Sequence, residues 1–168
     1  ADVKYVFNEI ESLLPYLSSD TTVLVSSQMP VGSIQKIEVY AKENFPDLEL
    51  GFAYSPENLR LGKAIENFLN PDRIVVGIRR EKDRNRLLTL LSPISDHIEW
   101  MSIESAEMTK HAINAFLATS VTFANELAAI CELTEANAKE VERGLKTEQR
   151  IGPMAYLSPG SAFSGGTL

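Results

Sequence analysis

The sequence lacks several features that mark specialised classes of protein. Only one of its 168 residues is cysteine, Cys131, so an internal disulfide is impossible and the sequence contains no paired-cysteine zinc motif. It has no run of about 18 apolar residues, and its first residues do not show the basic-then-apolar pattern of a signal peptide. We therefore expect a cytoplasmic protein without a membrane span. Cys131 falls in an apolar helical pattern and is expected to be a core residue.

Positive charge and metal-ligand patterns are also scarce. The formal net charge of −7 argues against nucleic acid as a main partner, because phosphates would not be neutralised. Basic residues gather only within residues 79–86, where acidic residues alternate with them, so we interpret this segment as a solvated helix face. The two histidines, His97 and His111, have no pair of carboxylates nearby, so no metal site is predicted.

The most prominent feature present is a long helical pattern over residues 102–132. Apolar residues recur there at three- and four-residue steps without proline or glycine, which predicts one helix of roughly 40 Å. A second apolar row makes much of its circumference apolar, so burial against a partner subunit or another domain is expected. The first row is Ala106, Ile113, Leu117, Val121, Ala124, Ala128 and Cys131, and the second is Phe116, Phe123, Leu127 and Ile130.

Before this helix, short β-branched runs alternate with helical patterns. The alternation predicts an α/β fold with a parallel sheet and crossover helices, the layout of half a nucleotide-binding domain. Ser33 is expected to cap the second helix. Strands are expected at 21–27, 48–56, 73–78 and 97–101, and helices at 3–18, 33–44, 62–68 and 81–91.

After the long helix, the sequence predicts one more helix and then a loop. Thr134 is a suitable N-cap for a helix over residues 135–145. From Lys146 onward the chain is rich in glycine and proline, and a loop of this composition is expected to lie against a ligand or partner.

Four segments, taken in order, resemble the UDP-glucose/GDP-mannose dehydrogenase family of nucleotide-sugar dehydrogenases. The resemblance implies an NAD-binding Rossmann domain and a central long helix that forms a homodimer, in enzymes of polysaccharide biosynthesis. The segments are SSQMPVGS (26–33), SPENLRLGKAIENFLNPDRIVVG (55–77), SAEMTKHAINAFLA (105–118) with NELAAICE (125–132), and RIGPMAYLSPGSAFSGG (150–166).

By this resemblance the chain is a fragment of such an enzyme. Residues 1–101 would be the second half of the Rossmann domain, and residues 102–168 a small helical dimerisation domain ending in the substrate-binding glycine loop. The family's glycine-rich NAD fingerprint, GxGxxG, does not occur in the sequence and is expected ahead of residue 1. The isolated fragment is therefore expected to be inactive.

The resemblance also implies site residues. Glu57 matches a glutamate beside the nicotinamide and the reacting carbon, where a carboxylate acts in general base chemistry. Lys110 and Asn114 match a helix pair that stabilises the alkoxide of the sugar. NAD would contact Ser27, Gln28 and Glu57, and the nucleotide sugar would contact Arg150, Tyr156, Gly160, Phe163 and Gly165.

Three positions depart from the family pattern. Thr167 stands where the family has its nucleophilic cysteine, Leu61 replaces a second glutamate, and Gln28 replaces a threonine. A threonine hydroxyl is a poor nucleophile without a strong base. Two interpretations remain open. One is a dehydrogenase with an altered second oxidation, and the other is a homodimerisation or nucleotide-sugar binding module with a degenerate catalytic site.

Overall fold

The computed structural model describes residues 2–57 and 62–162, and these form two compact units. The first unit covers residues 1–110 and the second residues 111–168. The helix α5 (Ile103–Leu133) contributes residues to both. The domain boundary between residues 101 and 102 that the sequence suggests stays a prediction.

The first unit alternates helices and strands as the sequence predicts, so the α/β class is confirmed. The first helix is shorter than expected and ends in a 3₁₀ turn, η1 (Leu14–Tyr16), where Pro15 cannot donate to a preceding carbonyl. The other elements are α1 (Val3–Leu13), β1 (Thr22–Val25), α2 (Ser33–Asn44), β2 (Gly51–Tyr54), α3 (Ala64–Leu69), β3 (Ile74–Ile78), α4 (Glu81–Leu91) and β4 (Ile98–Met101).

The four strands form one sheet in the order β1-β2-β3-β4. Thr22 of β1 pairs with Gly51 of β2 in parallel, and β3 pairs with β4 in parallel. The expected all-parallel sheet is wrong at one place, because β2 and β3 are antiparallel, with Tyr54 opposite Gly77. The segment between them carries only the six-residue α3, and it returns the chain at the same end of the sheet instead of crossing over.

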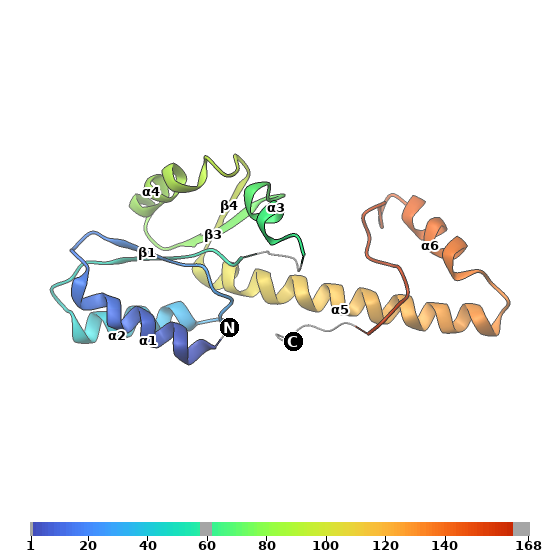
Figure 1. The fold of residues 1–168 in the computed structure, drawn as a ribbon, viewed down its shortest axis with the longest axis horizontal. Coiled ribbons are helices and arrows are strands. Elements are labelled where there is room, and N and C mark those ends of the chain that lie inside the picture. The colour runs from blue at the N-terminus through green and yellow to red at the C-terminus, as the bar shows by residue number, and fades with distance from the viewer. Residues whose placement is uncertain (1, 58–61, 163–168) are drawn as a thin grey trace. The chain divides into compact units, whose positions relative to one another are not determined.

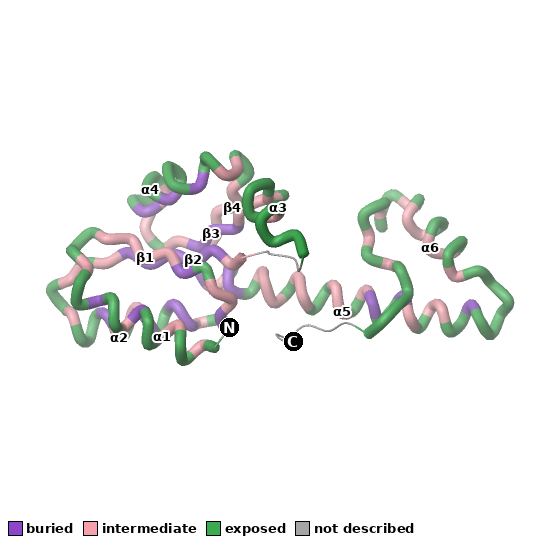
Figure 2. Tube along the Cα trace, viewed as in Figure 1, coloured by how far each residue is buried: buried purple, intermediate pink, exposed green. Residues whose placement is uncertain are grey.

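Each face of this sheet is covered by a different set of helices (Figure 1). Helices α1 and α2 cover one face, where the core includes Ile10, Leu14, Ile34 and Ile37 together with Ile103 and Ala106 of α5. Helix α4 covers the other face, where Leu87 and Leu91 pack against Ala53 and Val76. Figure 2 shows buried positions in purple on α4 and on the strands. Arg84 of α4 lies over the ring of Trp100 on β4, 4.9 Å from its centroid, and Trp100 packs against the core of this face.

By length and composition α5 passes the criterion for a membrane-spanning helix, as the core helices of many soluble proteins do. Its first two turns place Ile103 and Ala106 in the core of the first unit. Its later turns hold Cys131 buried, as expected, and also Val121 and Ala124.

The second unit adds α6 (Ala138–Thr147). The predicted cap Thr134 is wrong, because its hydroxyl instead donates to the carbonyl of Ile130 at the end of α5. Glu135 has a positive φ of 58°, which ends α5, and Asn137 caps α6 by accepting from the amides of Lys139 and Glu140. The sequence thus offers two candidate N-cap residues three positions apart, Thr134 and Asn137, and Asn137 is the cap.

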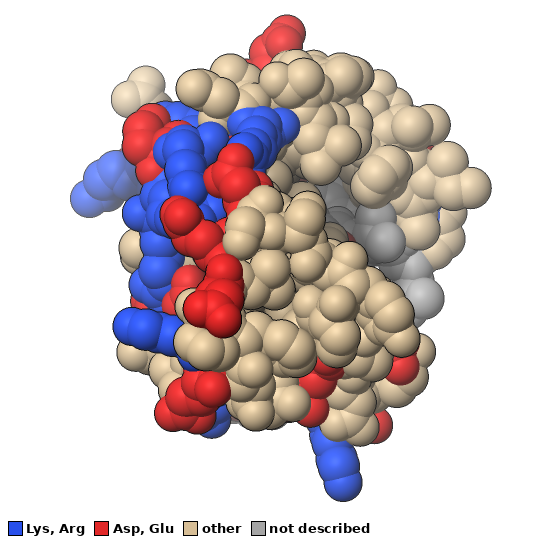
Figure 3. Space-filling model, turned by 90° about the vertical axis from the view of Figure 1, so that its left-hand side faces the viewer, with Lys and Arg blue, Asp and Glu red and all other residues tan. Residues whose placement is uncertain are grey.

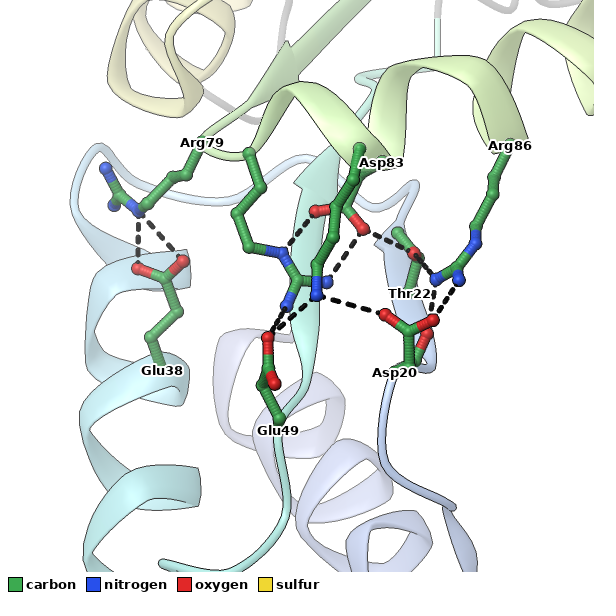
Figure 4. Close-up of polar contacts among 9 residues, drawn as sticks. Asp20, Thr22, Glu38, Glu49, Arg79, Asp83 and Arg86 are labelled. Atoms are coloured by element: carbon green, nitrogen blue, oxygen red, sulfur yellow. Dashed lines mark hydrogen bonds and ion pairs between the residues drawn. The ribbon is translucent and has the colours of Figure 1, made fainter.

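The basic segment 79–86 is not simply a solvated helix face. Figure 3 shows lysine and arginine side chains gathered among acidic side chains in a band on one side of the visible face. Asp83, however, is fully buried. Its carboxylate accepts two hydrogen bonds from Arg80, at 2.7 and 2.8 Å, and one from the hydroxyl of Thr22 at 2.7 Å (Figure 4). These bonds fasten the first turn of α4 to β1.

Around this buried pair, more exposed charges extend the network. Lys82 bridges Asp20 and Glu49 at 3.1 and 2.7 Å, and Arg86 also pairs with Asp20. Hydrogen bonds from Arg86 and Lys82 lower the pKa of Asp20 to about 2. Gly51 is part of the arrangement, since a Cβ there would lie 2.0 Å from Nη2 of Arg80.

We predict that Asp83→Asn lowers the free energy of unfolding by about 3 kcal/mol, because it leaves Arg80 without its buried carboxylate. Burial raises the pKa of Asp83, but Arg80 and Thr22 outweigh it and hold the pKa below its usual value. A carboxyl group whose pKa is lower in the folded state stabilises the fold fully at pH values above its unfolded pKa of about 3.9. This stabilisation is lost as the pH falls from that value through the folded pKa. Urea unfolding from pH 7 to pH 2 should therefore show a shallower loss of stability for Asp83→Asn.

The matched control is Glu81→Gln on the same turn, whose exposed pair with Arg84 should contribute less than about 0.5 kcal/mol. Equal effects of the two substitutions at neutral pH would contradict the structural role given to Asp83.

Candidate functional site

The turn that follows β1 carries the two predicted cofactor residues Ser27 and Gln28. Its conformation depends on Gly32, whose φ of 85° favours glycine. Among the described residues, the side-chain nitrogen Nε2 of Gln28 is buried and has no hydrogen-bond acceptor. A buried donor of this kind is costly unless a ligand or water satisfies it, so Gln28 fits a ligand contact.

Glu57 lies just after β2 and lines a cleft of about 310 Å³ in the first unit. The cleft lies next to the carboxyl ends of β1 and β2, since Ser26 and Ser55 also line it. Ligands of open α/β sheets bind at such strand ends. The Oδ1 atom of Asn67, another lining residue, is buried without a donor among the described residues. Glu57 thus lines a cleft at a strand end, where open α/β sheets bind ligands.

Tyr54 links this region to the turn after β1. It is fully buried, and its hydroxyl accepts a hydrogen bond from the amide of Met29 at 3.2 Å. Burial raises the pKa of Tyr54, the Met29 amide opposes this, and the negative charges of Glu107 and Glu57 raise it further. Tyr54 also pairs with Gly77, the residue against which Ile103 packs, so the end of β2 lies near the first turn of α5.

The start of α5 lies directly against the sheet. A Cβ on Gly77 of β3 would be 2.7 Å from the Cα of Ile103 and 2.9 Å from the Cβ of Ala106. This close approach fixes the first turns of the helix. Lys110 and Asn114 follow on the same helix one turn apart, and both are half-buried.

The predicted sugar-binding residues belong to the second unit, where three of them are described. Arg150 is exposed and pairs with Glu148 at 2.9 Å, and Tyr156 is also exposed. The amide of Gly160 donates to Asn125 of α5 at 2.8 Å, so the loop is anchored there. Phe163, Gly165, Thr167 and Leu61 lie outside the described residues.

Sequence reasoning missed the contribution of Glu107. It is fully buried and accepts hydrogen bonds from the amides of Gly32 and Ile34. The expected cap Ser33 instead donates its hydroxyl to the carbonyl of Pro30. In the sequence, Glu107 is marked only as a glutamate within an apolar helical pattern. That pattern does not indicate that its partner is Gly32, 75 residues away.

A four-stranded α/β sheet with a cleft at its strand ends, followed by a long helix, is the layout of an α/β nucleotide-binding protein. Residues 1–95 match the NAD binding domain of the UDP-glucose/GDP-mannose dehydrogenase family, and residues 104–168 match the family's central domain. The chain belongs to this family, which confirms the resemblance seen in the sequence. The match to an NAD binding domain also confirms NAD as the cofactor.

Curated relatives and solved structures agree with this assignment. The chain is 35% identical over 168 residues to UDP-glucose 6-dehydrogenase of Rickettsia typhi, covering 98% of this chain and 38% of the relative. It is 35% identical over 166 residues to UDP-glucose 6-dehydrogenase YwqF of Bacillus subtilis, with the same coverage of each. The chain thus spans well under half the length of these relatives.

Among solved structures, a UDP-glucose dehydrogenase from Pyrobaculum islandicum superposes with a TM-score of 0.87 at 29% identity, covering 98% of this chain and 39% of that one. A GDP-mannose dehydrogenase from Pseudomonas aeruginosa superposes with a TM-score of 0.79 at 25% identity, covering 99% and 40%.

The close contact at Gly77 generates a prediction. Gly77→Ala should lower the free energy of unfolding by about 2 kcal/mol, because the new methyl group meets the backbone of α5 and the helix must shift. Thermal or urea unfolding measures this effect.

Gly144→Ala is the matched control, since it adds the same methyl group in open space within α6. It should raise stability by about 0.5–1 kcal/mol through helix propensity. If Gly77→Ala proves neutral, the close packing of α5 on β3 is contradicted.

Proposed function

We propose that the parent protein oxidises the C6 alcohol of a nucleotide sugar, a UDP-sugar first among candidates, with NAD as hydride acceptor. The observation that carries this proposal is the placement of Glu57 just after β2, whose end pairs with Gly77, the residue against which the helix that bears Lys110 and Asn114 begins. The UDP-glucose 6-dehydrogenases of Rickettsia typhi and Bacillus subtilis support UDP-glucose as the first substrate to test.

NAD, which the turn carrying Ser27 and Gln28 would hold, would supply the hydride acceptor for the carbinol carbon, so the hydroxyl proton would need an acceptor of its own. In this proposal Glu57 accepts that proton, directly or through a water. The ammonium group of Lys110 and the amide of Asn114 stabilise the negative charge that develops on the oxygen. One such step yields an aldehyde, NADH and a proton. The buried donor Nε2 of Gln28 supports a cofactor contact at the turn after β1.

The second oxidation is where this sequence departs from its family. An aldehyde must gain an oxygen nucleophile before a second hydride leaves, and a thiolate serves that purpose where it is present. By the resemblance, Thr167 and Leu61 stand where the family has its cysteine and second glutamate. We therefore propose that the reaction ends after the first hydride transfer.

The test uses the full-length parent protein with NAD and UDP-, GDP- and TDP-sugars, with NADH counted per sugar consumed. We expect about one NADH per sugar. About two would show that oxidation to the acid proceeds without the thiol, and none with any sugar would favour the alternative, a nucleotide-sugar binding and dimerisation module.

Substitutions at the site should lower kcat. Glu57→Gln and Lys110→Met each remove a group that acts on the reacting oxygen or its proton, and we expect losses of about 10²–10³-fold. Glu66→Gln and Lys63→Met, at an exposed pair on and next to α3, are matched controls that should leave kcat unchanged. Equal effects of site and control variants would contradict these roles.

We further propose that the parent is a homodimer formed through α5. Among described residues, α5 exposes Phe116, Phe123 and Ile130 at seven-residue intervals, with side chains 70%, 51% and 55% exposed, and Leu133 at 86%. A seven-residue apolar repeat is the pattern by which helices pair. A second copy of the same helix offers an equal surface, so a twofold interface follows naturally.

Sedimentation tests this proposal. Phe116→Glu with Phe123→Glu should convert a dimer into monomers, because two charges would be buried at the interface. Tyr16→Glu, which changes an aromatic side chain that is 86% exposed on another element, should leave the dimer intact. A monomeric unsubstituted protein at low concentration would contradict the proposal.

A further inference from the structure

The carboxylate of Glu107 joins two elements that the proposed reaction needs. Glu107 lies in the second turn of α5, and its side chain is fully buried. Its Oε2 accepts a hydrogen bond from the amide of Gly32 at 2.6 Å, and its Oε1 accepts one from the amide of Ile34 at 3.0 Å. These amides belong to the N-terminal end of α2, whose own N-cap Gly32 has no side chain to cap it.

This contact is therefore a helix cap supplied from a distant element. The first amides of a helix need acceptors, and a carboxylate there also interacts favourably with the helix dipole. Glu107 meets both requirements for α2, and we call this interaction the Glu107 cap. Because its two oxygens accept from two different amides, the cap fixes both the distance between the Glu107 carboxylate and α2 and the orientation of that carboxylate.

On the α2 side, the Glu107 cap holds the turn that follows β1. Gly32 is four residues after Gln28, and the turn is anchored again at Met29, whose amide donates to Tyr54. The turn that carries the buried side-chain amide of Gln28 is thus held by hydrogen bonds at Met29 and, through the Glu107 cap, at Gly32.

On the α5 side, the same carboxylate is three residues before Lys110, less than one helical turn. We propose that Glu107 is a positioning residue that holds Lys110 at a fixed place relative to the cofactor turn. This inference rests on the proposed function, since it acts through Lys110. It adds a residue that touches neither cofactor nor substrate.

A second contact between the same helices gives a control. Arg79 pairs with Glu38 of α2 at 2.7 Å and with Glu104 of α5 at 2.6 Å. These groups are partly exposed, so solvent screens them and the pairs contribute little to rigidity. Glu104→Gln therefore removes a carboxylate from α5 three residues before Glu107 while the buried cap stays in place.

The test is a double-substitution cycle in the full-length protein, using NADH formation as the readout. Glu107→Gln keeps the volume of the side chain but has one acceptor oxygen for two amides. We expect kcat to fall about 10–100-fold, the range of a misplaced catalytic group, with the Glu104→Gln control within twofold. Glu107→Asp, which keeps the charge but shortens the reach, should show a similar fall.

The cycle separates positioning from general stability. In a Lys110→Met background, where residual NADH is followed over hours, adding Glu107→Gln should lower the rate by less than about twofold, since the positioned group is already absent. The same fold-loss in both backgrounds, or an unchanged kcat for Glu107→Gln alone, would overturn the assignment while leaving the proposed function intact. An unsubstituted protein that forms no NADH would overturn both.

Discussion

The contact between the start of α5 and the first unit is the constraint on which the site depends. Gly77 brings the helix against β3, with no room for a Cβ, and the Glu107 cap fastens it to α2. Because a buried carboxylate without partners is strongly unfavourable, the two amides and the carboxylate must remain together in the folded state. The turn after β1, the end of β2 and the first turns of α5 are therefore joined to one another, and Tyr54 links the first two by accepting from Met29.

The elements of this fold could be predicted from local patterns, whereas the contacts between them could not. Helix α2 begins and ends within the predicted range 33–44, and the long helix differs from its prediction by one residue at each end. The direction of β3 relative to β2 leaves no trace in residue periodicity. The burial of Asp83 has no sign in the sequence because its neighbours are charged, and its hydrogen-bond partner Thr22 lies 61 residues away.

The candidate site shows the same division. Glu57, Lys110 and Asn114 were named because they match family motifs, and the structure adds that Glu57 lines a cleft at a strand end. Glu107 matches no role stated by the resemblance, and only three-dimensional contacts reveal it. In the proposed function, Glu57, Lys110 and Asn114 serve the first hydride transfer, and Thr167 and Leu61 stand where the resemblance places the groups of the second. A framework that still holds Lys110 in place is consistent with a protein in which the first step is retained.

The most direct test of this account is a crystal structure of the full-length protein with NAD and a nucleotide sugar bound. The account predicts that Nζ of Lys110 lies about 3 Å from the oxygen of the carbon to be oxidised, with the Glu107 carboxylate still accepting from Gly32 and Ile34. It also predicts that Nε2 of Gln28 donates to the bound cofactor. A complex in which Lys110 points away from the sugar, or in which the Glu107 cap is broken, would contradict the account.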